Sequence, residues 1–315
     1  MNFKKISIIL AALLLLLVVL KIKDKKQGDR SFKAYVVSID TSKVDKMSIT
    51  PKGASDKVEL FKNEGLWMLK LNGKDVQANI DIIDELLSQV SSLKTKSVAA
   101  TSKEKWGDYE VTDSTGTRIS INSGKKQLAD FMIGKFSYKQ PQGQNPYQQQ
   151  QNIQMTSYLR LINENEVYAV DGYLSMMFNR DANSFRENSV VVGKPDNWNK
   201  LIFNYPADSS FTLVKQNNKW MVNGILADSV AISSYFSKIR MLTNNNFDDE
   251  TFIDANQQPE MSVRIEGDNF TPIQIDAYKN SMGEPVFTSS INKGNLMKAG
   301  NTKQALFVGQ QQFIK

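Results

Sequence analysis

The sequence predicts an α+β protein: an N-terminal transmembrane helix, then two related halves, each of antiparallel hairpins with one amphipathic helix. Three observations lead to this class. An apolar run lies near the N-terminus, a hairpin-and-helix pattern occurs twice, and a turn-rich stretch separates the two occurrences. We therefore divide the chain into a signal anchor with its basic flank (1–30), a first half (31–195) and a second half (196–315).

The apolar run covers residues 6–20, ISIILAALLLLLVVL. With Phe3 and Ile22 it approaches the ~20 residues that a helix needs to cross a bilayer, because flanking lysines can extend toward water. No small residues suited to signal-peptidase cleavage follow it, so an uncleaved anchor is favoured over a cleaved signal peptide. The residues expected in the bilayer include Ile6, Leu10, Leu14, Leu17 and Leu20.

The orientation of this anchor has two readings. More Lys and Arg follow the run than precede it, which would place the following chain in the cytoplasm. A short N-terminus before a Leu-rich stretch is typical of an export signal. We therefore expect a single-pass protein of the cytoplasmic membrane whose C-terminal domain is extracytoplasmic.

The repeated pattern begins with a hairpin at 58–69 (VELFKNEGLWML) and again at 211–222 (FTLVKQNNKWMV). Each has an alternating strand, a polar turn and a second strand that opens with Trp-Met. Aromatic residues at such positions mostly pack inside, so Trp67 and Trp220 are predicted to be core anchors.

An amphipathic helix is predicted after each hairpin, with Asn79 and Asp228 as N-caps. Aligning the two caps superposes two apolar stripes of helical spacing. The aligned stripes are Ile83, Leu87, Val90 and Leu93 in the first half and Ile232, Phe236, Ile239 and Leu242 in the second.

Further strands are predicted on both sides of these units, and the two halves meet at the turn-rich residues 193–197. A short helix is expected at 172–179. The predicted strands are 46–50, 117–122, 128–133, 156–162 and 166–170 in the first half, and 200–205, 261–266 and 273–278 in the second.

A glutamine-rich stretch at 139–154 has ten Gln or Asn among its sixteen residues. Such a composition buries too little apolar surface to fold alone, so a long loop is predicted. It is either a solvated connection or a partner-contacting loop, in which case Tyr147 is its candidate contact.

Composition excludes several chemistries. With no Cys and no His, the chain has no thiol nucleophile, disulfide, Cys/His zinc site or Ser-His-Asp triad. Phosphate-binding and dinucleotide-binding glycine motifs are absent, so we expect no enzyme and no cofactor. The net charge is +6, but seven of the 39 basic and two of the 33 acidic residues lie in 1–30. The remaining residues carry only +1, which argues against nucleic acid as a partner.

Two charged clusters remain. Asp248, Asp249, Glu250 and Asp254 are the best metal candidate, but they lack the ligand spacing of a calcium loop, so a solvated acidic loop is preferred. Arg180 and Arg186 are candidates for holding an anionic ligand or a partner's carboxylate. A structural salt bridge is the simpler reading of these arginines.

The order of several short motifs resembles the DUF4340 family of bacterial membrane-anchored proteins. These motifs are the anchor, Leu60-Phe61-Lys62 leading to Trp67, the capped helix 79–94, Trp106-Gly107-Asp108-Tyr109, Phe131-Met132-Ile133-Gly134, Glu166-Val167-Tyr168-Ala169-Val170 and Ser184-Phe185-Arg186 with Val190-Val191. The family's more usual Tyr-Gly-Leu is Trp-Gly-Asp here, and the glutamine-rich stretch looks like an insertion. The resemblance supplies no catalytic residues. It implies an accessory role beside gliding-motility-type ABC transporters.

We therefore expect a non-enzymatic, membrane-anchored accessory protein of an envelope complex, with the lipid bilayer and a membrane protein such as an ABC-type permease as partners. The alternative is a membrane-tethered ligand- or glycan-binding ectodomain. A partner module should expose an apolar patch, whereas a glycan binder should expose aromatic residues in a concave site. A carboxylate-dependent hydrolase has the least support.

Overall fold

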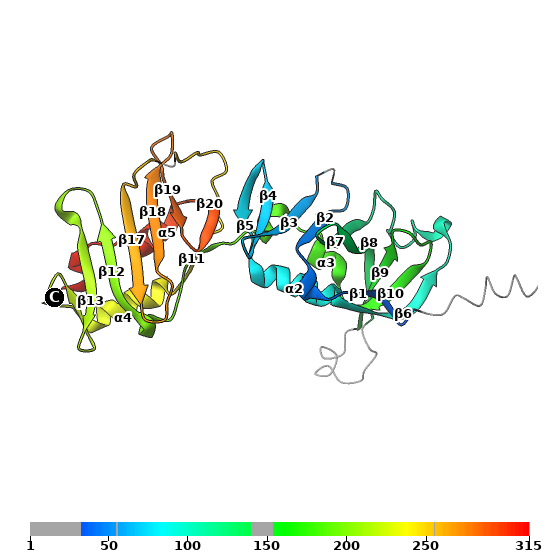
Figure 1. The fold of residues 1–315 in the computed structure, drawn as a ribbon, viewed down its shortest axis with the longest axis horizontal. Helices are drawn as coiled ribbons and strands as arrows, with labels where there is room; N and C mark the ends of the chain where they lie inside the picture. The colour runs from blue at the N-terminus through cyan, green and yellow to red at the C-terminus, as the bar shows by residue number, and fades with distance from the viewer. Residues whose placement is uncertain (1–32, 55, 140–153, 255, 315) are drawn as a thin grey trace, which may run out of the picture. The chain divides into compact units, whose positions relative to one another are not determined.

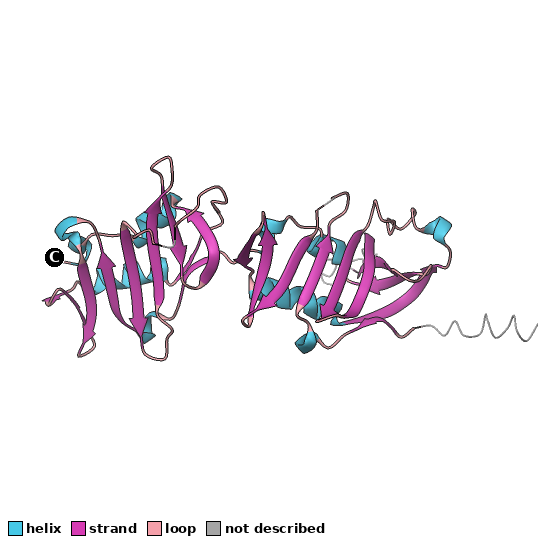
Figure 2. Cartoon of the chain, turned by 45° about the horizontal axis from the view of Figure 1, so that its top comes forward, coloured by secondary structure: helices cyan, strands magenta, loops and turns pink. Residues whose placement is uncertain are grey.

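The computed structural model describes residues 33–54, 56–139, 154–254 and 256–314. It is mostly antiparallel β-sheet with few helices (Figures 1 and 2), which confirms the predicted class at this level. The described residues form two compact units: those within 1–40, 89–116 and 131–175 form unit 1, and those within 41–88, 117–130 and 176–315 form unit 2. Within the described ranges no helix is both long and apolar enough to cross a bilayer. The predicted anchor lies outside those ranges.

Unit 1 is built on five antiparallel strands in the order β1-β6-β10-β9-β8, and the short helix α3 begins in unit 1 and ends in unit 2. The bounds are β1 (Tyr35–Ser38), β6 (Ser92–Ala100), β8 (Lys126–Lys139), β9 (Gln154–Leu161), β10 (Val167–Asp171) and α3 (Leu174–Phe178). Strand β8 begins in unit 2 and its later part lies in unit 1.

Unit 2 contains five strands in the order β7-β2-β3-β4-β5, an eight-stranded run β15-β14-β13-β12-β17-β18-β19-β20, and the pair β11-β16. The bounds of the first group are β2 (Lys46–Thr50), β3 (Val58–Asn63), β4 (Leu66–Leu71), β5 (Lys74–Gln77), α2 (Ile80–Ser91) and β7 (Thr117–Ser123). The others are β11 (Ser189–Val192), β12 (Trp198–Asn204), β13 (Phe211–Gln216), β14 (Lys219–Val222), β15 (Ile225–Leu226), α4 (Ser229–Ile239), β16 (Met241–Thr243), β17 (Met261–Gly267), β18 (Ile273–Lys279), β19 (Pro285–Ser289), β20 (Asn292–Lys298) and α5 (Gly300–Leu306).

The order of elements repeats along the chain. The run β17-β12-β13-β14-β15 has the same connectivity as β7-β2-β3-β4-β5, and a helix follows the fifth strand each time, α2 after β5 and α4 after β15. The pair β11-β16 likewise corresponds to β1-β6. The internal similarity detected in the sequence therefore reflects a repeated arrangement of strands.

Both predicted hairpins form with the same register. Lys62 lies opposite Trp67 in the first and Lys215 opposite Trp220 in the second. The two-residue turns place both central residues at positive φ, Glu64-Gly65 in one and Asn217-Asn218 in the other. Such turns match the twist of the strands that they connect.

Both predicted caps also form. The side chain of Asn79 accepts a hydrogen bond from the N–H of Ile82 at 3.2 Å, and that of Asp228 accepts one from the N–H of Val230 at 2.8 Å. The first helix is shorter than the predicted 79–94, because residues 92–100 leave it as β6. Leu93 fits the apolar stripe of a helix, but it is buried as a strand residue opposite Val37.

The core follows the predicted stripes. Ile232, Phe236 and Ile239 of α4 pack in a cluster with the fully buried Trp198. Trp67 is 3% exposed, as expected of a core anchor. Trp220 is half-buried and packs edge-on against Phe236, with ring centroids 5.0 Å apart.

Candidate functional site

Of the two arginines predicted as site residues, Arg186 is the more buried. It follows a short 3-10 helix, Ala182–Phe185, and is 3% exposed. Its Nε donates to the Asn295 side-chain oxygen at 2.7 Å, and its Nη1 donates to an Asp249 carboxylate oxygen at 3.0 Å. The guanidinium also lies 3.7 Å from the centroid of the Phe247 ring. Burial lowers the pKa of Arg186 and the neighbouring Asp249 opposes that shift.

Asparagine side chains extend this network between the end of β5 and β20. Asn295 donates to the carbonyl of Gln77 at 3.0 Å, and Asn292 donates to that of Glu187 at 2.8 Å. A side chain at Gly294 would collide with the carbonyl oxygen of Asp75. The cluster therefore joins two strand edges by buried side-chain hydrogen bonds. The contacts of Arg186 are those of a structural ion pair.

The acidic run beside Arg186 is engaged in local contacts. The Asp248 carboxylate accepts hydrogen bonds from the N–H of Glu250, and from the N–H and hydroxyl of Thr251. Burial alone would raise the pKa of Asp248, but these hydrogen bonds and the charge of Lys298 lower it below the ordinary value. Asp248 is 5% exposed, so the loop is less solvated than its composition predicts. No group of three metal-ligating side chains occurs among the described residues.

A second buried arginine, Arg160, lies in unit 1 on β9. Its guanidinium stacks 3.8 Å from the centroid of the Trp106 ring, and its Nε donates to the carbonyl of Val111 at 3.2 Å. Trp106 in turn donates to the carbonyl of Asn165 at 2.9 Å. These contacts hold the segment 101–116 against the sheet, so Trp106 acts here as packing for Arg160.

Gly134 explains why two of the family-like motifs occur together. The N–H of Lys135 donates to the carbonyl of Tyr109 at 3.0 Å. A Cβ at Gly134 would overlap that same carbonyl. Trp106-Gly107-Asp108-Tyr109 and Phe131-Met132-Ile133-Gly134 are thus two sides of one packing contact.

An exposed apolar patch lies where β8 and β9 extend beyond their covered part. It consists of Phe136, Tyr138, Met155 and Tyr173, of which Tyr138 is 67% exposed. Tyr138 lies opposite Met155 in the ladder, and the N–H of Gly172 donates to the carbonyl of Met155, which places Tyr173 next to them.

This patch continues the buried face of β9. Alternate residues of a strand share a face, so Met155, Ser157 and Leu159 point the same way. Ser157 and Leu159 are fully buried, and the first residue of α3, Leu174, donates to the Ser157 hydroxyl at 2.9 Å. Beyond α3, among the residues that the structure describes, the same face carries exposed apolar side chains, which is typical of an interaction surface.

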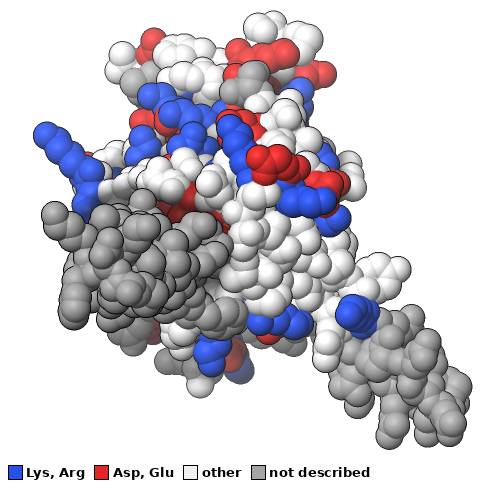
Figure 3. All heavy atoms as spheres, turned by 90° about the vertical axis from the view of Figure 1, so that its right-hand side faces the viewer, with Lys and Arg blue, Asp and Glu red and all other residues white. Residues whose placement is uncertain are grey.

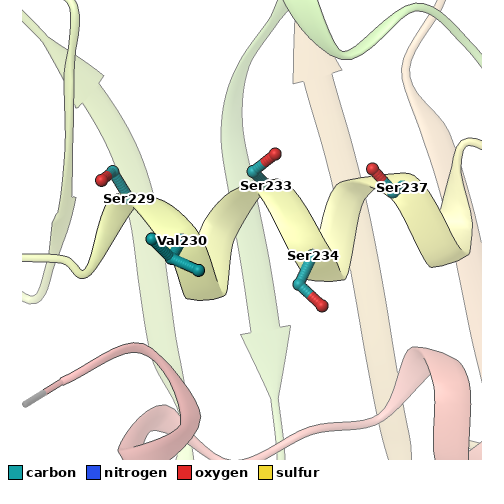
Figure 4. A pocket seen from close by; sticks show the side chains of 5 residues that line it. All are labelled: Ser229, Val230, Ser233, Ser234 and Ser237. Atoms are coloured by element: carbon teal, nitrogen blue, oxygen red, sulfur yellow. The ribbon is translucent and has the colours of Figure 1, made fainter.

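The hollows found on unit 2 are of a different kind. One, of about 390 Å³, is lined by Val230 and four serines of α4 (Figure 4). Another, of about 400 Å³, is lined by Thr50, Asp56, Lys57, Glu59 and Lys70. Aromatic platforms on which a sugar would stack are not among these lining residues.

Over the face seen in Figure 3, basic and acidic side chains are intermixed.

The other predicted site residues are placed as follows. Arg180 is half-buried and has no ion pair among the described residues. Tyr147 and the anchor residues Ile6, Leu10, Leu14, Leu17 and Leu20 lie outside those residues. Sequence reasoning missed Arg160, whose signal was a charged residue within the alternating strand 156–162. It also missed Asn292 and Asn295, which no motif marked.

Comparison with known proteins gives one match. No curated protein and no solved structure shows significant similarity to the chain. The model of a family described as Domain of unknown function (DUF4340) matches residues 67–260, which is more than half of the chain. It starts at Trp67 of the first hairpin and extends past the Arg186–Asp249 pair. The chain therefore belongs to the DUF4340 family.

Proposed function

We propose that this chain is a non-enzymatic accessory protein, held in the cytoplasmic membrane by residues 6–20 as an uncleaved anchor. Its folded part lies outside the cytoplasm and binds a membrane protein of an envelope complex. The partner that the family resemblance favours is the permease of an ABC-type transporter.

The observation that carries the proposal is the apolar patch of Phe136, Tyr138, Met155 and Tyr173. Solvated strands normally present polar side chains on their open face, and contiguous exposed apolar residues mark interaction sites. Aromatic residues and methionine are enriched at the buried centres of protein interfaces. The patch meets the expectation for a partner module better than the hollows of unit 2 meet that for a glycan site.

The position of the patch in unit 1 agrees with a membrane partner. Lys33, where the described chain begins, pairs with Glu164 in the same unit. Ten residues, 23–32, separate Lys33 from the extended apolar stretch. Even fully extended, ten residues span at most about 35 Å, so unit 1 would stay close to the bilayer.

The test is a detergent pull-down of the tagged full chain with quantitative mass spectrometry, comparing wild type, Tyr138→Asp and Met282→Asp. Met282 is a matched control because it is equally apolar and 71% exposed, but lies in unit 2. We expect a transporter permease in near-stoichiometric amount with wild type and Met282→Asp, and its loss with Tyr138→Asp. Recovery of no membrane protein, or equal recovery with all three, would contradict the proposal.

A further inference from the structure

The outer edge of the second repeat is open where the same edge of the first repeat is covered, and we propose that an extended strand of another protein pairs with it. This edge is β15, Ile225–Leu226, which lies in unit 2. The partner strand carries a glycine where it meets the β15 backbone, and apolar side chains beside Ile225 and Leu226. The proposal is independent of the transporter contact proposed above, which uses unit 1.

β15 and β5 occupy the same place in their repeats. Each follows an Asn-Gly turn in which both residues have positive φ. The register of the two hairpins is the same, so Val76 of β5 corresponds to Ile225 of β15, and Gln77 corresponds to Leu226. The first repeat therefore shows how an edge of this kind is covered.

In the first repeat two segments cover the edge. The N–H of Glu187, just after the 3-10 helix, donates to the carbonyl of Gln77 at 2.9 Å. The side chain of Asn295 on β20 donates to the same carbonyl at 3.0 Å. Gly294 of β20 lies so close that an added Cβ would be 2.5 Å from the carbonyl oxygen of Asp75. Covering this edge therefore requires a glycine in the covering strand.

The second repeat has the first of these covers but not the second. The carbonyl of Phe313 accepts a hydrogen bond from the N–H of Asp228 at 2.8 Å, just as that of Phe185 accepts one from Asn79 at 2.9 Å. The chain after Phe313 therefore corresponds to the chain after Phe185. β15 is the last strand of its run, and among the described strands only β14 pairs with it. Within the described structure, no strand takes the place beside β15 that β20 takes beside β5.

The exposed fractions of equivalent residues reflect this difference. Val76 is 2% exposed, whereas Ile225 and Leu226 are each 57% exposed. Neighbouring strand residues point to opposite faces, so this edge is open on both faces of the sheet. Solvated edges are normally protected by a lysine, a proline or a bulge, and β15 has none of these. Two large apolar side chains at such an edge are typical of an interaction site.

The backbone of β15 is oriented for strand addition. Val222 and Ile225 flank the two-residue turn and form a hydrogen-bonded pair, so the N–H and C=O of Leu226 point away from β14. In the first repeat the carbonyl of Gln77 points outward in this way and accepts the hydrogen bonds described above. Added strands gain affinity from such backbone groups and specificity from neighbouring side chains. Because Leu226 replaces Gln77, the side chains of the partner strand at this point are apolar.

A second copy of this chain cannot repeat the contact that β20 makes with β5. Its β20 is already bound to its own β5. The strand of the first repeat that corresponds to β20 is β10, because Met297 of β20 and Tyr168 of β10 pair with residues at the same distance beyond the two helix caps. Gly294 then corresponds to Asn165, whose Cβ would occupy the space needed by the backbone of the edge. The partner is therefore a different protein.

The test is photo-cross-linking of the full chain in living cells, with a photoreactive phenylalanine analogue at Leu226. The matched control places the analogue at Val192, another apolar strand residue of unit 2, which is 49% exposed. We expect a product at Leu226 that contains one protein other than this chain, joined through a single segment that includes a glycine. This product should be absent at Val192.

Two variants show whether the strand edge makes the contact. Adding Ile225→Lys to the Leu226 analogue should reduce the product about tenfold, because a charged side chain on an edge opposes strand addition. Ile225 is exposed, so this variant should keep the wild-type melting temperature, and loss of the product is then not due to unfolding. Adding Tyr138→Asp should leave the product unchanged, which separates this contact from that of unit 1.

A synthetic peptide with the sequence of the cross-linked segment tests the need for glycine. It should bind the purified full chain in detergent, and replacing its glycine with alanine should weaken binding about tenfold, because the added Cβ meets the backbone of the edge. Products formed only between copies of this chain, equal products at Leu226 and Val192, or a product unaffected by Ile225→Lys would overturn the proposal. So would equal binding of the glycine and alanine peptides.

Discussion

Arg186 shows how much of the fold can depend on one side chain. Its guanidinium contacts Asn295, Asn183 and Asp249, and its Nη2 is buried without a hydrogen-bond partner in the described structure. Truncating Arg186 to alanine would leave these oxygens unpaired. Removing one member of a buried ion pair costs about 3–5 kcal/mol. Because the Asp249 side chain is 34% exposed, we expect a value near the lower end.

The measurement is urea unfolding of Arg186→Ala and of the half-buried control Arg180→Ala. We expect the control to remain within about 0.5 kcal/mol of wild type. Equal and small losses for both variants would show that the Arg186 network does not stabilise unit 2.

Asp248 gives a pH-dependent prediction. Because its pKa in the folded state lies below the ordinary value, its contribution to stability is present above that ordinary value and is lost as the pH falls through the folded pKa. We expect Asp248→Asn to be less stable than wild type at pH 7 by about 1 kcal/mol, the usual net worth of a hydrogen bond.

The difference should shrink as the pH falls from the ordinary Asp pKa of about 3.9 through the lower folded pKa of Asp248. Urea unfolding at pH 7 and at a series of pH values below about 4 checks this, with the exposed Asp208→Asn as a control that changes little throughout. A difference that stays constant or grows at low pH would be inconsistent with a lowered pKa for Asp248.

Among the elements, the two hairpins are equivalent in register but differ in how deeply each tryptophan is buried. Trp67 is 3% exposed, whereas Trp220 is half-buried. We expect Trp67→Ala to lower the free energy of unfolding by about 3–5 kcal/mol, as for other buried aromatic residues. Trp220→Ala should cost less, about 1–2 kcal/mol, because the half-buried side chain of Trp220 buries less apolar area on folding than that of Trp67. Urea unfolding measures both, and a larger loss for Trp220→Ala would contradict the assignment of the two environments.

The glutamine-rich segment gives a prediction for a connection between strands. Lys139 and Gln154 pair at the ends of β8 and β9, so the segment starts and ends at neighbouring positions. Replacing 140–153 with a short Gly/Ser turn should change stability by less than about 1 kcal/mol, because loop closure depends weakly on length. A large drop in melting temperature would show that the segment packs against the body. Normal folding with loss of partner binding would identify it as a contact element.

The elements with strong periodicity were predictable from the sequence. The hairpins, both capped helices and the strands at 46–50, 261–266 and 273–278 lie where alternation and capping residues place them. The predicted end of α2 was wrong, because Leu93 fits both the apolar stripe of a helix and the buried face of a strand. Strands β19 and β20 were missed, since Asn292, Lys293, Gly294 and Asn295 form β20 through contacts with distant parts of the chain.

In the candidate site, too, contacts between distant parts of the chain could not be predicted from the sequence. Arg186 was recognisable as a candidate, but its burial depends on Asn295, which is more than a hundred residues away. The apolar patch could not be predicted from the sequence either, because Phe136 and Tyr138 have the spacing of ordinary strand residues. Among the described residues, the point on β9 beside which α3 begins decides that Ser157 is buried and Met155 is exposed.

At the scale of the whole molecule, the proposed function requires the N-terminal run to hold the chain in the membrane. Replacing Leu14 and Leu16 with arginine should abolish membrane retention. Each central arginine costs about 2.5–3.5 kcal/mol of insertion free energy, which a short apolar run cannot offset. The readout is fractionation after carbonate washing. The mass of the mature wild-type chain is the companion measurement, since loss of the first residues would indicate a cleaved signal.

The most direct test of the central claim, binding of a membrane protein through the apolar patch, is site-specific photo-cross-linking in living cells. A photoreactive phenylalanine analogue replaces Tyr138 in the full chain, and replaces Met282 in a matched control. We expect a cross-linked product at Tyr138 that contains a transporter permease and is absent at Met282. Cross-linking only to lipid, or the same products at both positions, would contradict it.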